Sequence, residues 1–445
     1  MMEYKNSWPS RKLDMALAAL TLALTILASA TAGWAQSTET VLHAFTGGKG
    51  GVFPENLVAD SHGNLYGVAD GGTKGFGLVF KMTQTSPGNW KASALYNFTG
   101  GTDGSDPDGL VVDRTGKLFG VALTGGNLRC KEAEGVGCGT VFELAPASSV
   151  YQFTVLYTFQ GLSDGAQPTS LIVDSAGHLF GTAAYGGNNS DDCGGQGCGT
   201  AFELATVGGV WQGHTLHSFD TTDGPNPASA LALDAAGNLY GTSTYGGIGS
   251  CTNGLVSGCG LVYELVAGSG WYRKENVLYQ FLGTDDGAGP GAGVILDSTG
   301  NIYGATSAGG DTANCVAGCG VVFKLQSGSG AWTESLLYAF SGATDGSNPR
   351  SGLTQDKAGN FYGTTQFVNG SPYGGVYELQ SVDGSLSEGS LYSFADGSDG
   401  GYPIGNLILD LSGNIYGTTS LGGNHGPSCG TDGCGVVFEI SPGAK

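Results

Sequence analysis

Aspartates recur at one position of this 445-residue chain, in segments of the form Asp-Gly-x-x-Pro such as the one that begins at Asp103. One carboxylate from each copy could build an acidic ring that holds a cation or a cationic ligand. The competing interpretation is structural, because Asp-Gly followed by Pro makes a rigid turn. The candidate ligand-binding residues are Asp103, Asp164, Asp223, Asp285, Asp345 and Asp399. One carboxylate per copy does not bring several oxygens to one point, so we favour the turn and predict no metal site.

Histidines add little further chemistry, although the chain has six of them. None stands in a recurring pattern with an acidic or nucleophilic partner. His214 and His217 are three residues apart on an expected strand, where successive side chains alternate between faces. We therefore expect them to point to opposite faces and not to chelate one ion together. No catalytic residue and no cofactor is predicted, although scattered carboxylates could still assemble in three dimensions.

Ten cysteines fall in five close pairs, and each repeat of the chain has both members of a pair or neither. The pairs are Cys130 with Cys138, Cys193 with Cys198, Cys251 with Cys259, Cys315 with Cys319, and Cys429 with Cys434. Zinc binding is the alternative, but the spacing varies and no histidine accompanies the pairs. We predict five disulfides. Closing such small loops stabilises the fold by only about 2 kcal/mol each, so the bonds are expected mainly to fix loop shape.

These residues lie in a repeat whose most regular segment is Asn238-Leu239-Tyr240-Gly241, present in seven copies. The aromatic position recurs every 53 to 63 residues, at 66, 119, 180, 240, 303, 362 and 416. Each copy contains four strand-like pieces, which in the fourth copy are residues 228–234, 238–243, 260–265 and 275–281. An Asp-x-x-Gly turn joins the first two pieces in every copy, and its aspartate is expected to be a turn former. Four short strands per repeat predict one propeller blade.

The two ends of the chain predict how the ring closes. Residues 41–45 form a fourth strand that has no third strand before it, and residues 436–440 form a third strand with no fourth strand after it. Pairing the two would remove both exposed edges. The prediction is therefore an all-β fold, a seven-bladed β-propeller of four-stranded blades, closed by the N-terminal strand completing the last blade. A right-handed β-helix is the alternative, but it would not explain the missing strands.

One face of such a propeller carries both the loops between the second and third strands and the links between blades. The cysteine pairs lie in those loops, and the Asp-Gly segments lie in those links. This face is the predicted binding face. Since repeats 1 and 6 lack cysteines, we expect the site to lie off-centre, toward blades 2 to 5. Trp90, Trp211, Trp271 and Trp332 recur at the start of the outer strand, which favours packing at the blade rim over a substrate platform.

The N-terminus and the charge bear on where the protein acts. Residues 1–35 have basic residues, an apolar run and then small residues, which indicates a signal peptide, with an uncleaved anchor as the alternative. Residues 36–445 are expected to form a single domain. The formal net charge of −21 disfavours nucleic acid and anionic membranes as partners. We expect a secreted or periplasmic monomer with no stable membrane anchor after cleavage.

In order, the repeat reads Leu-Tyr-x-Phe, Asp-Gly-x-x-Pro, Gly-Asn-Leu-Tyr-Gly-Thr, Gly-Gly and Gly-Cys-Gly-x-Val-Phe-Glu-Leu. It resembles the GloVer tandem repeat of the choice-of-anchor bacterial proteins over nearly all of residues 41–440. The resemblance implies an exported or surface-displayed bacterial protein and brings no established activity. Our leading hypothesis is a binding or interaction module for an extracellular glycan or protein. The alternatives are a glycan-active hydrolase or lyase that uses the same face, and a structural cell-surface protein.

Overall fold

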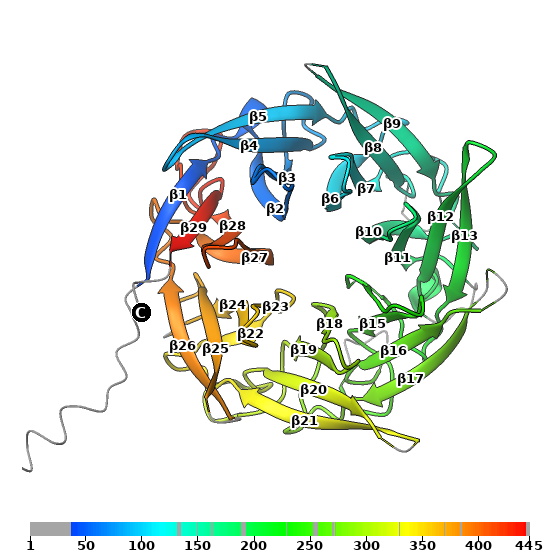
Figure 1. Cartoon of the computed structure of the whole chain (residues 1–445), viewed down its shortest axis with the longest axis vertical. Coiled ribbons are helices and arrows are strands. Elements are labelled where there is room, and N and C mark those ends of the chain that lie inside the picture. The colour runs from blue at the N-terminus through cyan, green and yellow to red at the C-terminus, as the bar shows by residue number, and fades with distance from the viewer. Residues whose placement is uncertain are drawn as a thin grey trace, which may run out of the picture.

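The structure is a computed structural model of the chain. It describes residues 37–441 except 131–134, 149, 162, 188–192, 228, 252–256, 269–270, 272, 329, 369 and 383–384. The predicted signal peptide, residues 1–35, lies outside the described residues. Seven antiparallel sheets form a ring around a common centre (Figure 1). Two single-turn 3-10 segments, Gly48–Gly50 and Cys193–Gly195, are the only helical elements in the described part of the chain. The predicted seven-bladed β-propeller is confirmed.

Blades 1 to 6 take their strands in chain order from the centre to the rim (Figure 1). Blade 1 contains β2 (Val52–Ala59), β3 (Leu65–Asp70), β4 (Leu78–Ser86) and β5 (Asn89–Asn97). Blade 2 contains β6 (Ser105–Val112), β7 (Leu118–Thr124), β8 (Thr140–Ala147) and β9 (Val150–Thr158). Blade 3 contains β10 (Ala166–Val173), β11 (Leu179–Tyr185), β12 (Thr200–Val207) and β13 (Val210–Ser218). Blade 4 contains β14 (Ala232–Leu233), β15 (Leu239–Ser243), β16 (Leu261–Val266) and β17 (Lys274–Gln280). Blade 5 contains β18 (Val294–Leu296), β19 (Ile302–Thr306), β20 (Val321–Ser327) and β21 (Trp332–Ala339). Blade 6 is β22 (Ser347–Pro349), β23 (Thr354–Gln355), β24 (Phe361–Phe367), β25 (Gly375–Val382) and β26 (Ser385–Ser393).

Blade 7 combines both ends of the described chain. It contains β27 (Gly401–Leu409), β28 (Ile415–Leu421), β29 (Val436–Ser441) and, as its outer strand, β1 (Thr38–Ala44). The β1 strand runs antiparallel to β29, with Thr38 opposite Ser441 and Ala44 opposite Val436. The predicted closure is confirmed, and the closing strand begins three residues earlier than the expected residue 41. The β1 strand therefore covers the edge of β29 that would otherwise be open.

The inner strands of blades 4 to 6 are shorter than the sequence pattern predicts. In blade 4 the expected strand 228–234 is reduced to β14, and in blade 6 it is split into β22 and β23. Blade 4 has Pro225 in addition to the link proline, and this residue lacks the backbone N–H that a ladder needs, whereas Gly291 and Gly293 favour an irregular path in blade 5. The innermost position is therefore the least regular part of the ring.

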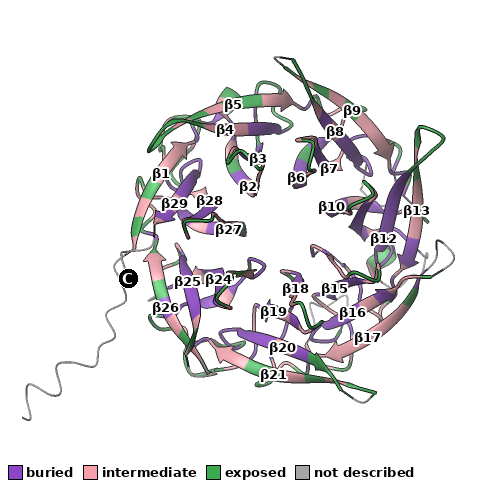
Figure 2. Cartoon of the chain, viewed as in Figure 1, coloured by how far each residue is buried: buried purple, intermediate pink, exposed green. Residues whose placement is uncertain are grey.

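Packing between blades depends on the phenylalanine of the Leu-Tyr-x-Phe segment. The third strands, such as β12 and β20, are largely buried (Figure 2). The phenylalanine ring is buried in every blade and meets the aromatic ring of the next blade's third strand. The pairs, with centroids 5.0 to 5.2 Å apart, are Phe45 with Phe80, Phe98 with Phe142, Phe159 with Phe202, Phe219 with Tyr263, Phe281 with Phe323, Phe340 with Tyr377, and Phe394 with Phe438. The glycine of the second strand lies against the third-strand ring of its own blade: a Cβ at Gly304 would stand 2.6 Å from Phe323 Cζ. The same joint is thus built seven times.

The turn aspartates act as predicted. Asp297 Oδ1 accepts the backbone N–H groups of Thr299 and Asn301, at 2.8 and 3.0 Å. Its Oδ2 accepts the side-chain amide of Asn301 and the hydroxyl of Tyr303, at 2.7 and 3.0 Å. Burial alone would raise the pKa of Asp297, but these hydrogen bonds hold it well below its usual value. The carboxylate is fully used within its own turn.

Candidate functional site

The loops between second and third strands and the links between blades lie on the same side, which we call the loop face. In each link, the residue before the proline donates its N–H to a carbonyl at the end of the preceding blade's loop. Examples are Gln167 to Cys138 at 2.9 Å, and Asn348 to Cys319 at 2.8 Å. Blades without cysteines keep the contact, since Asp106 donates to Phe76 at 3.1 Å. The loop of one blade therefore positions the start of the next.

The five disulfides connect the predicted partners. The Cα atoms of the pairs are 4.9 to 5.4 Å apart. Each bond closes a loop between a second and a third strand. Since the second cysteine also accepts the hydrogen bond from the next blade, the disulfide fixes the loop where it supports its neighbour.

The residue before the link proline has a positive φ in all seven blades. These residues are Phe53, Asp106, Gln167, Asn226, Gly289, Asn348 and Tyr402, with φ between 48° and 66°. Such a conformation is uncommon for residues other than glycine and is often kept at functional positions. The backbone is the same in each copy, but the side chain is aromatic, acidic, an amide or absent. We call this set the link ring, and it is where the otherwise similar blades differ in chemistry.

A pocket of about 450 Å³ opens on the loop face between blades 5 and 6. The disulfide loop of blade 5 contributes Asn314 and Cys315, and blade 6 contributes Asn348, Arg350 and Phe367. Arg350 is exposed, and Phe367 is 37% exposed. The Asn348 side chain donates to Gln366 Oε1 at 2.5 Å, whereas its own Oδ1 is buried and accepts no hydrogen bond within the described part of the chain. A guanidinium, an aromatic ring and an unused amide oxygen therefore line one pocket.

The structure places the candidate link aspartates in separate turns. The hydroxyl of a tyrosine on the outer strand donates to each of four of them: Tyr96 to Asp103, Tyr157 to Asp164, Tyr338 to Asp345 and Tyr392 to Asp399, at 2.9 to 3.1 Å. Backbone N–H groups of the same link donate to them as well, as Thr99 does to Asp103. Burial alone would raise the pKa of Asp103, but the bonds from Thr99 and Tyr96 hold it below its usual value. These contacts make the rigid turn, and a ligand-binding role of the six aspartates stays a prediction.

For one candidate, Asp285, the residue in the link position is the next one along the chain. Asp286, and not Asp285, occupies the link position of the fourth joint, where it accepts from Tyr279 Oη at 3.2 Å and from the N–H of Leu282 at 2.8 Å. Asp286 follows its tyrosine by seven residues, as the equivalent aspartates do. Asp286 also stands directly before Gly287 and four residues before Pro290, so the Asp-Gly-x-x-Pro pattern itself points to Asp286 and not to Asp285. Counting forward from the tyrosine would have found it.

Four joints add a second carboxylate that the sequence reasoning missed. Glu39, Glu275, Glu334 and Glu388 lie on the outer strand of the following blade, each beside the link aspartate of the joint. Burial, and then the nearby aspartate, raises the pKa to about 8 for Glu275 and about 7 for the other three. The Oε1 atom of each is buried without a hydrogen-bond partner among the described residues. A glutamate four residues before the Leu-Tyr-x-Phe aromatic was the available signal.

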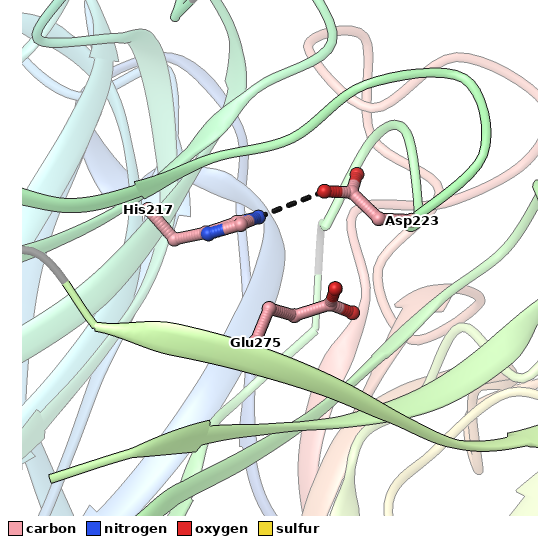
Figure 3. Close-up of side chains that lie close together, drawn as sticks. All are labelled: His217, Asp223 and Glu275. Atoms are coloured by element: carbon pink, nitrogen blue, oxygen red, sulfur yellow. Dashed lines mark hydrogen bonds and ion pairs between the residues drawn. The ribbon is translucent and has the colours of Figure 1, made fainter.

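At the joint between blades 3 and 4, a histidine replaces the tyrosine. His217 Nε2 lies 2.9 Å from Asp223 Oδ2, and one ligand atom from each of His217, Asp223 and Glu275 lies within 4.8 Å of the others (Figure 3). The expectation that His214 and His217 face opposite ways is wrong. A bulge at Leu216 places them opposite Glu203 and Ala201, which are two apart and share a face. Both face blade 4, where His214 stacks on Trp271 with centroids 3.6 Å apart.

A separate group of acids lies on the inner strands of blades 1 and 2. Burial, and then the charges of Asp108 and Asp70, raises the pKa of Glu55 to about 8. Burial raises that of Asp108 to about 6, although it accepts from Asn56 at 2.6 Å and from the N–H of Gly109. Two carboxyl groups with well-separated pKa values are thus held close to the centre of the ring.

Each tryptophan of the described chain contacts the preceding blade, which agrees with a packing role. Trp90 meets Tyr416 and Trp211 meets Phe119, each with centroids 6.1 Å apart. Trp332 packs against the core cluster that contains Tyr240. Trp271 stacks on His214 and is 48% exposed. In the part of the chain described, no helix has the length and apolar character needed to cross a bilayer.

Solved structures resemble this chain at low identity. The extracellular domain of a protein described as a one component system, from B. thetaiotaomicron, is 10% identical with a TM-score of 0.51, over 90% of this chain and 40% of that one. A gluconolactonase from Xanthomonas campestris is 13% identical with a TM-score of 0.40, over 93% and 92% of the two chains. An ulvan lyase of polysaccharide lyase family PL25 is 11% identical with a TM-score of 0.48, over 89% and 95%. At such identity the match with a TM-score of 0.51 shows a shared fold alone.

A comparison with curated proteins gave no match. The family model of the Gloeobacter/Verrucomicrobia repeat matches residues 31–251 and 248–445, which together include all seven blades. The repeat inferred from the Leu-Tyr-x-Phe and Gly-Cys-Gly segments is therefore confirmed, and the chain belongs to the Gloeobacter/Verrucomicrobia repeat family.

Proposed function

We propose that this protein is a binding module that takes an extracellular carbohydrate in the loop-face pocket between blades 5 and 6. The observation that carries the proposal is the meeting of Phe367, Arg350 and Asn348 in one pocket. An exposed aromatic ring can cover the apolar face of a sugar, and amides bond its hydroxyl groups. The buried Oδ1 of Asn348 would gain the hydrogen bond that it lacks when a ligand hydroxyl donates to it.

The surroundings of the pocket support a rigid site. The Cys315–Cys319 disulfide fixes one wall, and the N–H of Asn348 is bonded to the Cys319 carbonyl at 2.8 Å. A wall that is ordered before binding reduces the entropy lost on association. Arg350 adds a preference for a sugar with a carboxylate or sulfate group, which a guanidinium binds through two parallel hydrogen bonds. The net charge of −21 works against densely charged polymers, so we expect a glycan with isolated anionic groups.

A glycan array followed by calorimetry tests this proposal. Phe367→Ala and Arg350→Gln should each weaken binding of the best array ligand by about 10-fold or more, since each loses a central contact worth about 1.4 kcal/mol or more. Lys357→Gln is the matched control, because Lys357 is an exposed cation in the turn after β23, away from the pocket residues. Equal affinity of the wild type and both pocket variants, or no glycan bound at all, would argue against the proposal.

Glycan hydrolysis is the second candidate, and the acids of blades 1 and 2 favour it. A carboxyl group with a raised pKa can act as a general acid beside one that is ionised, as glycosidases require. Glu55 and Asp108 fit these two roles. Release of reducing ends from a bound glycan, lost in Glu55→Gln but kept in Arg350→Gln at saturating substrate, would support it. Binding without release of reducing ends would contradict the hydrolase hypothesis and would favour the binding module.

A further inference from the structure

We propose that His217, Asp223 and Glu275 bind one Zn²⁺ ion at the joint between blades 3 and 4. Histidine nitrogen and carboxylate oxygen are both zinc ligands, and three protein ligands leave a fourth position for water. His217 Nε2 and Asp223 Oδ2 are 2.9 Å apart, and a small separation of the two side chains would give the spacing of about 3.3 Å that two ligand atoms take on a tetrahedral zinc ion. Glu275 completes the set, since all three ligand atoms lie within 4.8 Å of one another (Figure 3).

The surrounding structure orients these ligands. His217 lies on β13, just after the bulge that turns it toward blade 4. Asp223 accepts the N–H of Asp220 through Oδ1 at 2.6 Å, which leaves Oδ2 directed at the imidazole. Glu275 comes from β17 of the next blade, where it stands opposite Leu265. The three ligands thus come from a strand, a link and the neighbouring blade, so an ion here would tie two blades together.

A buried hydroxyl points to a ligand independently of these three side chains. Tyr263 is fully buried, and its Oη has no hydrogen-bond partner among the described residues. Its charged neighbours are Glu275 and Asp223. Tyr263 stands opposite Val277, two residues along β17 from Glu275 and on the same face. A polar group left unpaired in a core is costly, and a water on the zinc ion would give this hydroxyl a partner.

Comparison with the other joints shows what is special about this one. The joint between blades 5 and 6 also has an aspartate, a glutamate and a buried tyrosine, but it has Tyr338 where His217 stands. His217 precedes its aspartate by six residues, whereas the tyrosines precede theirs by seven. The shorter link brings the carboxylate within reach of the shorter imidazole. His43 occupies the same position in blade 7, but there the link has Gly50 instead of an aspartate.

The test uses the full chain, stripped with a chelator and titrated with Zn²⁺ by calorimetry, with bound zinc counted by mass spectrometry. We expect one ion per chain and a higher unfolding temperature when it is bound. Glu275→Gln and His217→Gln should weaken binding by more than the about 10–100-fold that loss of an outer-shell partner costs.

Glu388→Gln is the matched control, because Glu388 holds the equivalent place at the joint between blades 5 and 6, where no histidine is present. It should leave the zinc stoichiometry at one. Equal zinc binding by the wild type, Glu275→Gln and His217→Gln would overturn the proposal, as would a wild-type chain that binds no zinc. Two different ligand variants keep the test decisive if one of them fails to fold.

Discussion

At the scale of single residues, this chain uses aspartate for two purposes that look alike in sequence. The turn aspartates, such as Asp234 and Asp297, bond within one blade, whereas the link aspartates bond a tyrosine or histidine of the outer strand. Both kinds accept hydrogen bonds from N–H groups of their own turn or link. What differs is the neighbour: a link aspartate can face a glutamate of the next blade, as Asp223 does.

Removing one turn carboxylate should cost stability in a pH-dependent way. Asp297→Ala loses five hydrogen bonds and is expected to lower the free energy of unfolding by about 1–3 kcal/mol at pH 7. The pKa of Asp297 is lower in the folded chain than in the unfolded one. The stabilisation is therefore complete above about pH 4 and is lost as the pH falls through the folded-state pKa.

Urea unfolding at pH 7 and at pH 2 measures this effect. The difference between the wild type and Asp297→Ala should be smaller at pH 2. Asp297→Asn serves as the control, because its side chain still accepts hydrogen bonds but does not titrate in this range. A gap between the wild type and Asp297→Ala that is the same at both pH values would show that the charge of Asp297 does not contribute.

Single residues also show how far sequence reasoning reaches. The five disulfides, the seven turn aspartates and the packing of the tryptophans followed from position within the repeat. The link ring could not be predicted in this way, because its seven residues share a positive φ and not a side-chain type. The His217 site was missed because strict strand alternation fails at a bulge, and the extra residue at Leu216 is visible only in the strand pairing.

At the scale of elements, one contact links each third strand to the next blade. The glycine that opens the third strand has a positive φ and lies under the link proline of its neighbour: a Cβ at Gly320 would stand 2.6 Å from Pro349 Cδ and 2.4 Å from the Thr306 carbonyl oxygen. Backbone atoms cannot move aside as a flexible side chain can. The glycine and the proline of the repeat are therefore two halves of one interface.

Gly320→Ala and Gly300→Ala separate the two costs of replacing such a glycine. Both positions have similar φ, 92° and 84°, but a Cβ at Gly300 meets nothing within 4 Å. Gly300→Ala should cost about 1–2 kcal/mol for the backbone angle alone. Gly320→Ala should cost about 1–3 kcal/mol more, since the added methyl group overpacks the interface. Chemical denaturation of the two variants gives the comparison, and equal losses would mean that the blades shift apart without penalty.

Element prediction succeeded where strands are long and failed where they are interrupted. The second and third strands alternate or run apolar and lie between clear turns, so their existence was evident from the sequence. The inner-strand segments of blades 4 to 6 carry Pro225, Gly291, Gly293 and Gly352, and the repeat pattern gave no measure of how much ladder these would remove. The pocket beside Arg350 opens along this irregular stretch, so it could not be placed from the sequence.

At the scale of the whole molecule, a single strand decides whether the chain is a closed ring. The β1 strand pairs with β29 along its length, and its Phe45 inserts between blades 7 and 1, where it is 2% exposed and meets Phe80. Without β1, the edge of β29 would be open and blade 1 would lose the aromatic partner that every other blade has. Such an edge invites pairing with another chain.

A chain that starts at residue 46 should therefore be much less stable than one that starts at residue 37. Loss of the buried Phe45 side chain alone is worth about 3–5 kcal/mol, and the β-ladder adds to this. We expect a lower unfolding temperature and concentration-dependent association, measured by calorimetry and light scattering. A synthetic peptide of residues 37–45 should restore both toward the values of the longer chain, because strand addition supplies the missing edge. The same peptide with Phe45→Ala is the matched control and should restore less. If the shortened chain stays monomeric and melts at the same temperature, ring closure by β1 contributes little, and the contacts between successive blades alone hold the propeller together.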